Sequence, residues 1–152
     1  MRRCVVLDTG IVGAVCRTGT IPIDCLECEG WLNLLQTNQW EICLPEIADY
    51  EIRRELLRAK KQNSLRVLDN LKFTTRYIPI ETKHMLLAAT LWANARNNRM
   101  GTADPKALDG DVILSAQALS NASEYSSVII ATNNVSHISR YCNAAEWRDI
   151  AP

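Results

Sequence analysis

A short apolar run that ends in an aspartate and a glycine constrains the fold of this chain more than any other feature. Residues 4–10 read CVVLDTG, which predicts a buried strand whose carboxyl end presents Asp8 where the chain must turn. In an open α/β sheet, ligands bind at this edge. Asp8 is therefore the first candidate site residue, and a cap for the segment that follows is its alternative role.

The order of the remaining elements predicts a parallel sheet with helices on both sides. Sequential strands lie too far apart for hairpins, and helical patterns separate them. We expect further strands at residues 41–45, 76–80, from 126 onward and, at one edge, 146–150. We expect helices at residues 25–36, 46–60, 64–72, 83–97, from about 109 onward and 135–141. A chain of 152 residues with 47% hydrophobic content suits one domain spanning residues 1–152.

Charge and hydropathy argue against a strongly basic nucleic-acid-binding protein, a membrane-spanning protein and a secreted protein. The formal net charge is zero, so any contact with nucleic acid must come from a local basic patch. A basic stretch from residue 53 to 61, in and just after the helix at 46–60, is a candidate for such a patch or for a partner-facing surface, and a solvated helix face is the alternative. It contains Arg53, Arg54, Arg58, Lys60 and Lys61. No run approaches the ~20 apolar residues of a membrane span, and no signal peptide is recognisable. We expect a cytoplasmic protein that contacts no membrane.

The cysteines and tryptophans carry no functional signal of their own. Without an export signal, the six cysteines should stay reduced. Cys25 and Cys28 are spaced as helical neighbours, and no second pair stands nearby to complete a zinc site. Trp31, Trp40 and Trp92 are expected in the core. In the helix at 83–97, the predicted buried face comprises Met85, Leu86, Ala89 and Trp92, which leaves His84 on the surface.

Acidic residues stand on the core-facing side of the helix at 46–60. At 100° per residue, Glu51 and Glu55 fall on the same face as Ala48 and Ile52. Ordinary ion pairs with Arg54 or Arg58 are one interpretation. Two glutamates four residues apart repel each other, and a bound cation would reverse this repulsion.

Two later segments add polar side chains that a parallel sheet would bring to the same edge. Asp109 and Asp111 are predicted in the cap and first turn of their helix, where one carboxylate would satisfy the free amides. The strand from 126 ends in Thr132 and Asn134. Clustered carboxylates without histidine select Mg²⁺ or Mn²⁺ over zinc. Such an ion suits phosphodiester hydrolysis, since it activates water and stabilises charge on the phosphoryl group.

The ordered set of motifs resembles the PIN-domain family, and within it the VapC-type ribonuclease toxins of bacterial toxin–antitoxin pairs. The motifs are VVLDTG, LPEIADYEIRREL, LDGDVILSAQAL and VIIATNN, in the family's order over nearly the whole chain. The resemblance implies a three-layer α/β/α sandwich with a five-stranded parallel sheet. It also implies Mg²⁺- or Mn²⁺-dependent cleavage of single-stranded RNA, with transfer RNA among the substrates to test, and a homodimer neutralised by a cognate antitoxin.

The resemblance assigns roles residue by residue. Asp8, Glu51 and Asp111 correspond to the metal-binding acidic triad, and Asp109 is an assisting ligand. Asn134 stands where the family often has a fourth aspartate, and its amide can orient water. Thr132 corresponds to a hydroxyl near the same site, and Thr9 to a polar position after the first aspartate.

Three other functions are alternatives to a nuclease. The tripeptide Asp8-Thr9-Gly10 is also the aspartic-protease sequence, but that chemistry needs paired all-β lobes. A Rossmann-type phosphate-binding domain would need glycine motifs that this chain lacks. The remaining alternative is a catalytically weak or inactive PIN-like scaffold that binds RNA or protein. The presence of all three main carboxylates favours an active enzyme.

Overall fold

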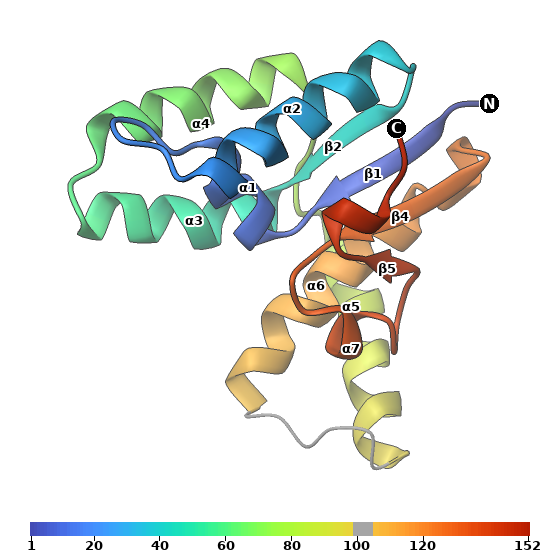
Figure 1. Ribbon diagram of the computed structural model, residues 1–152. Helices are drawn as coiled ribbons and strands as arrows, with labels where there is room; N and C mark the ends of the chain where they lie inside the picture. The colour runs from blue at the N-terminus through green and yellow to red at the C-terminus, as the bar shows by residue number, and fades with distance from the viewer. Residues whose placement is uncertain (99–104) are drawn as a thin grey trace.

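The centre of the structure is a five-stranded parallel sheet with β1 in the middle (Figure 1). The computed structural model describes residues 1–98 and 105–152. The strands lie in the order β3-β2-β1-β4-β5, and every neighbouring pair is parallel. They are β1 Arg3–Leu7, β2 Glu41–Pro45, β3 Arg76–Ile78, β4 Ser127–Ala131 and β5 Ala144–Ala145. The predicted parallel sheet is confirmed.

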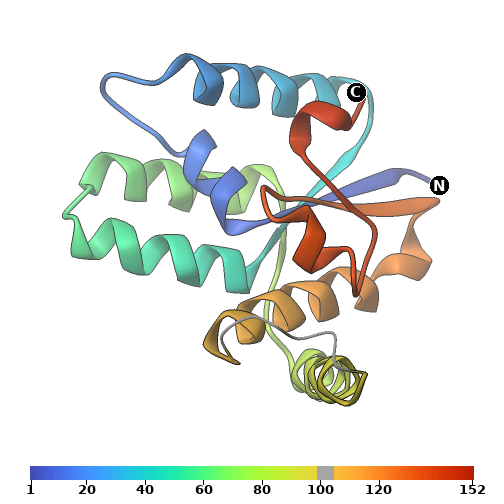
Figure 2. The ribbon, with the colours of Figure 1, turned by 60° about the horizontal axis from the view of Figure 1, so that its bottom comes forward.

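Helices cover both faces of this sheet, which makes a three-layer α/β/α sandwich (Figures 1 and 2). Helices α1 to α4 lie on one side, α6 on the other, and α5 packs outside α6. Their bounds are α1 Thr9–Val15, α2 Ile23–Thr37, α3 Glu46–Arg58, α4 Gln62–Thr74, α5 Thr82–Asn97, α6 Pro105–Ser120 and α7 Val135–Ile138. In the described residues, no helix is long and apolar enough to span a membrane.

Side chains of β1 alternate between two hydrophobic cores. Val5 and Leu7 are fully buried in the core shared with α1 and α2, whereas Cys4 and Val6 face the core shared with α6. A strand buried on both faces is apolar at consecutive positions. This burial explains the continuous run that made β1 recognisable in the sequence.

Asp8 lies where the strand order reverses. β1 pairs with β2 on one side and with β4 on the other, and the Asp8 amide donates a hydrogen bond to the Ala131 carbonyl at 3.0 Å. The connection after β1 leads to β2, and the later strands β4 and β5 occupy the opposite side. Such a switch point opens a crevice at the carboxyl ends of the strands.

A buried glutamine joins the two helices that flank this crevice. Gln117 of α6 is fully buried, accepts a hydrogen bond from the Ile47 amide at 3.2 Å and donates one to the Ile78 carbonyl at 2.7 Å. Ile47 lies at the start of α3 and Ile78 at the end of β3. The side-chain amide therefore holds α6, α3 and β3 in a fixed arrangement.

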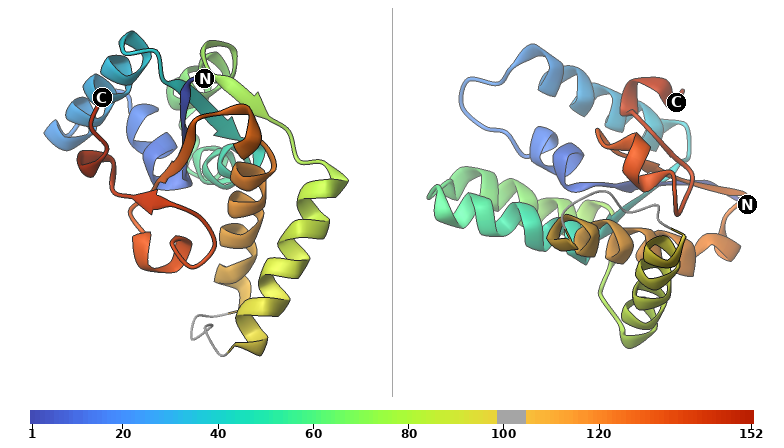
Figure 3. Two further views of the ribbon diagram at one scale, coloured as in Figure 1. Left: turned by 90° about the vertical axis from the view of Figure 1, so that its right-hand side faces the viewer. Right: turned by 90° about the horizontal axis from the view of Figure 1, so that it is seen from below.

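The last strand lies earlier than predicted. β5 is the short segment Ala144–Ala145, and residues Trp147–Asp149 form a 3₁₀ turn in place of the predicted strand at 146–150. The Trp147 ring packs against Trp31 of α2, with ring centroids 5.6 Å apart. This contact turns the chain away from the sheet edge toward α2 (Figure 3).

The start of α6 and the buried face of α5 also differ from the predictions. α6 begins at Pro105, so Asp109 and Asp111 are not in its cap or first turn. Part of the predicted loop before it, including Gly101, lies outside the described residues. In α5, Met85 and Leu86 are exposed, whereas His84 is buried. α5 packs on α6 through small residues such as Ala88, which leaves its large apolar side chains, including Trp92, outside.

Candidate active site

Both oxygens of the Asp8 carboxylate are held by hydrogen bonds. The Thr9 amide donates to Oδ1 at 2.7 Å, and the Thr132 hydroxyl donates to Oδ2 at 2.6 Å. Thr132 is fully buried, and its oxygen accepts a hydrogen bond from the Asn134 amide at 2.9 Å. Asp8 therefore caps α1 and is also fixed by the strand end of β4. Hydrogen bonds to an ionised carboxylate are stronger than neutral ones, which makes this orientation rigid.

Glu51 reaches the same crevice from α3. The Thr9 hydroxyl donates to Glu51 Oε1 at 2.9 Å, so Thr9 contacts Asp8 with its amide and Glu51 with its side chain. The Glu51 carboxylate also lies against Gly110 of α6, where an added Cβ would be 3.1 Å from Oε2. Glycine at this position lets the carboxylate approach α6 closely.

Asp111, on α6, completes a set of three carboxylates. Burial, followed by the negative charges of Asp8 and Glu51, raises its pKa from 3.8 to about 6. His137 and Arg140 act in the opposite direction. The charges of Asp8 and Glu51 both act on Asp111, so the three carboxylates lie in one electrostatic environment.

Two predicted site residues, Asp109 and Asn134, are exposed. Asp109 is exposed and lines a groove of about 400 Å³ between α5 and α6 together with Met85 and Trp92. Asn134 stands at the start of α7, and its backbone amide donates a hydrogen bond to the Thr132 hydroxyl. The proposed roles of Asp109 as a ligand and of Asn134 in orienting water remain predictions.

The donor set suits a hard divalent cation. In the described part of the chain, no group of three or more His, Cys, Asp or Glu side chains is arranged to hold a metal ion. Mg²⁺ does not require such a cage, because it keeps several waters and binds through one or two carboxylates. Oxygen donors from Asp8, Glu51 and Asp111, together with the raised pKa of Asp111, are consistent with a position that positive charge would stabilise.

A groove of about 840 Å³ is lined by Gly10, two residues after Asp8, and by Asn133, which follows Thr132. Residues of α1 and the end of α3 also line it, and its cationic side chains are Arg17, Arg58 and Lys61. Arg58 and Lys61 belong to the basic stretch predicted from the sequence, whereas Arg17 was not predicted. Asp24 and Glu55 line the groove as well, so its walls carry both signs of charge with a small positive excess.

Other members of the basic stretch have structural partners. Arg53 forms ion pairs at 2.9 Å with Asp49 and with Asp69, which join α3 to α4. Arg54 stacks over the Tyr50 ring. Arg58, which lines the groove, pairs with Glu55 of the same helix at 2.9 Å, and both side chains are exposed, so Glu55 does not face the core as predicted.

Sequence reasoning missed three contributors to the site. Gly110 matters through the space it leaves for Glu51, and His137 and Arg140 matter through their positive influence on Asp111. For His137 and Arg140, the signal in the sequence was a basic pair shortly after the polar end of β4. Gly110 had no such signal, because α3 approaches α6 only in the folded chain.

Comparison with known proteins gives a match in structure and none in sequence. No protein-family model and no curated protein matches this chain. Among solved structures, VapBC2 from Rickettsia felis bound to a DNA fragment from their promoter matches with a TM-score of 0.70 and 17% identity. That match covers 95% of this chain and 98% of the other.

Two further structures agree with it. VapBC-1 from nontypeable Haemophilus influenzae matches with a TM-score of 0.66 and 16% identity, over 96% of this chain and 99% of the other. DNA-bound VapBC from Salmonella typhimurium matches with a TM-score of 0.64 and 16% identity, over 97% and 99%. These matches confirm, at the level of the fold, the resemblance inferred from the motifs: the chain has the PIN-like α/β/α fold found in VapBC structures.

Proposed function

We propose that this protein is a metal-dependent endoribonuclease that hydrolyses phosphodiester bonds in single-stranded RNA. The observation that carries the proposal is the meeting of Asp8, Glu51 and Asp111, from three separate elements, at the switch point of the sheet. Carboxylates that repel one another cost stability. Their placement in a crevice is typical of a functional site.

These three residues would hold Mg²⁺ or Mn²⁺. When bound, the ion activates water and stabilises charge on the phosphoryl group. The chain itself supplies orientation: Thr132 and the Thr9 amide fix the Asp8 carboxylate, and the Thr9 hydroxyl fixes Glu51. We assign Asn134 the orientation of water at the strand end. The predicted assisting role of Asp109 is secondary in this proposal, because its exposed side chain lines the groove between α5 and α6.

The groove beside the carboxylates would receive the RNA strand. Its cations, Arg17, Arg58 and Lys61, would contact phosphates, which supply most of the affinity in nucleic-acid binding. A chain with no net charge needs such a local surface. The target, including any transfer RNA, would be selected by the shape and stacking of unpaired bases.

We further propose that the protein is the toxin of a type II toxin–antitoxin pair and forms a homodimer. Support comes from the motif resemblance to VapC-type toxins and from the fold shared with VapBC structures. Exposed large apolar side chains on α3 and α4, Leu57 at 56% and Phe73 at 89% exposure, are consistent with a protein partner.

The test is cleavage of a mixed pool of single-stranded and transfer RNA with Mg²⁺, Mn²⁺ or EDTA. The wild type, the Asp8→Asn variant and the Glu29→Gln variant are compared. Glu29 is an exposed carboxylate on α2 and does not line the groove, so it is the control. We expect cleavage that needs the ion, is lost in Asp8→Asn and is retained in Glu29→Gln.

An inert wild type that is folded and free of any partner would contradict the nuclease proposal. The protein would then be a PIN-like scaffold that binds RNA or protein. Cleavage that persists in EDTA and in Asp8→Asn would contradict the role of the carboxylates.

A further inference from the structure

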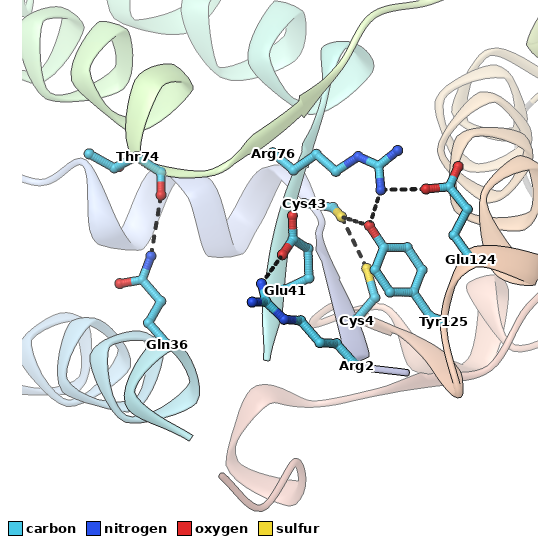
Figure 4. Close-up of polar contacts among 9 residues, drawn as sticks. All are labelled: Arg2, Cys4, Gln36, Glu41, Cys43, Thr74, Arg76, Glu124 and Tyr125. Atoms are coloured by element: carbon cyan, nitrogen blue, oxygen red, sulfur yellow. Dashed lines mark hydrogen bonds and ion pairs between the residues drawn. The ribbon is translucent and has the colours of Figure 1, made fainter. Parts of the chain in front are cut away.

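Two thiols lie against each other in the core on the face of the sheet covered by α6. Cys4 of β1 and Cys43 of β2 are each 1% exposed, and their Sγ atoms are 3.0 Å apart (Figure 4). Cys4 pairs in register with Glu41, and Cys43 with Val6, so the thiols meet diagonally across adjacent parallel strands. All six cysteines of the chain are free thiols.

A chain of polar groups connects Cys43 to the surface. The Tyr125 hydroxyl lies 3.8 Å from Cys43 Sγ, and the Arg76 guanidinium donates a hydrogen bond to the same hydroxyl. Arg76 also forms an ion pair with Glu124 at 2.7 Å, and the side chains of Arg76 and Glu124 are 36% and 49% exposed. Figure 4 shows these groups in a row from Glu124 to Cys4.

The direction of these hydrogen bonds makes the two thiols unequal. Because Arg76 can only donate, the Tyr125 proton is free to point toward Cys43. The hydrogen bond with Cys4 lowers the pKa of Cys43, as do the hydrogen bond from Tyr125 and the charge of Arg76, whereas burial acts in the opposite direction. The hydrogen bond to Cys43 and burial raise the pKa of Cys4. Cys43 is thus the better nucleophile and Cys4 the protonated partner.

We propose that Cys4 and Cys43 form an oxidisable dithiol, which a hydroperoxide converts to an intramolecular disulfide. The Cys43 sulfur attacks a peroxide oxygen, the O–O bond breaks, and sulfenic acid and water form. The Cys4 sulfur then attacks the Cys43 sulfur, an S–S bond forms and a second water leaves. The two thiols lose two electrons and two protons, and hydrogen peroxide is reduced to two waters.

The sulfurs are close enough to react, and because the two residues are diagonal in the register, closure also requires a shift of the backbone of the two strands. A disulfide has an S–S distance of about 2.05 Å, so the sulfurs must approach each other by roughly 1 Å. Because both thiols are buried, oxidation requires local opening at the Arg76–Tyr125 contact, and we expect a reaction over minutes to hours. The bond would join β1, which ends at Asp8, to β2, which leads into α3.

The other buried thiols lack this arrangement. Burial raises the pKa of Cys28 to about 11 and that of Cys16 to about 12, which makes both poor nucleophiles. Cys28 has Cys25 one turn away on α2, so this helical pair is the natural comparison for the pair in the sheet.

The experiment treats the folded full-length protein with hydrogen peroxide, blocks the remaining thiols with iodoacetamide in denaturant and maps peptides by mass spectrometry. We expect four of the six cysteines to remain alkylatable and one linked peptide pair to contain Cys4 and Cys43. Dithiothreitol should restore all six thiols. The Cys25→Ala variant should behave as the wild type, whereas Cys43→Ala should yield no Cys4-linked peptide.

A second variant tests the polar chain. Tyr125→Phe keeps the ring but removes the hydroxyl, and we expect disulfide formation about threefold to tenfold slower, since less of the Cys43 thiol is ionised. The proposal is overturned if peroxide oxidises exposed Met85 while all six thiols persist. It is also overturned if the linked pair is Cys25 and Cys28, or if Tyr125→Phe reacts at the wild-type rate. Peptide mapping of the wild type identifies which cysteines are linked even if Cys43→Ala does not fold.

Discussion

Replacing Asp111 with asparagine should stabilise the metal-free protein while abolishing its proposed activity. Burial and the charges of Asp8 and Glu51 raise the Asp111 pKa from 3.8 to about 6. At ~1.4 kcal/mol per pKa unit, this shift corresponds to about 3 kcal/mol of destabilisation when Asp111 is ionised. Because Asp111 is only partly buried and solvent screens its charge, we expect the asparagine variant to gain about 1–2 kcal/mol.

The gain should depend on pH in a defined direction. Between pH 3.8 and about 6 the folded state binds more protons at Asp111 than the unfolded state. The destabilisation by Asp111 is therefore fully present above pH 6 and disappears as the pH falls toward 4. Asp111→Asn should exceed the wild type in stability at pH 8 and match it at pH 4.

Urea unfolding in EDTA at pH 8 and at pH 4 measures this difference. A gain of 1–2 kcal/mol corresponds to a rise of roughly 2–8 °C in melting temperature for a chain of this size. Asp109→Asn is the control on the same helix, and because Asp109 is exposed its effect should stay within about 0.5 kcal/mol. The reasoning is refuted if Asp111→Asn is neutral or destabilising at pH 8, or if its gain persists at pH 4.

Three further outcomes follow from contacts in and around the site. Thr132→Val leaves Asp8 Oδ2 and the Asn134 amide without their partner, so RNA cleavage should fall about tenfold to a hundredfold, and Thr132→Ser should retain most activity. Gly110→Ala adds a methyl group 3.1 Å from Glu51 Oε2, so calorimetry should show weaker Mn²⁺ binding. Because alanine favours helix, urea unfolding should show a stability that is unchanged or raised by up to ~1 kcal/mol. Burial lowers the His84 pKa, so the contribution of neutral His84 to stability is fully present above pH 6.5 and is lost as the pH falls below it. In His84→Gln, the melting temperature should therefore fall less steeply as the pH is lowered from 6.5.

Strong local patterns made the central strands predictable. Residues 41–45 were predicted as a strand and form β2 with the same bounds, because a short apolar run precedes a proline that begins the next helix. The edge strand was placed wrongly, since a two-residue strand has no pattern of its own. Its position is set by pairing with β4 and by the contact of Trp147 with Trp31.

The face of α5 shows why periodicity alone is insufficient. The large apolar residues Met85, Leu86 and Trp92 suggested a buried stripe, yet the helix packs through Ala88 and His84 instead. Close packing of α5 on α6 requires small residues at the contact. The spacing of large apolar residues along a helix does not show which of its faces meets another helix.

The candidate site was predictable in its charged groups and unpredictable in its supporting contacts. Asp8, Glu51 and Asp111 each follow a strand or stand on a core-facing helix position, and parallel topology brings such positions together. The bond from Thr9 to Glu51 spans 42 residues of sequence, and no local rule encodes it. The close approach of Gly110 likewise depends on how α3 and α6 cross.

The hydrogen bond between the Ile47 amide and Gln117 makes the backbone a reporter of the proposed ion site. This amide lies one turn before Glu51, and its acceptor belongs to the helix that carries Asp111. Any drift between α3 and α6 that separates the two carboxylates must strain this bond. Hydrogen–deuterium exchange of the Ile47 backbone amide should therefore slow when Mg²⁺ or Mn²⁺ is added. The exchange rate would report how firmly α3 and α6 are held together, without any RNA present.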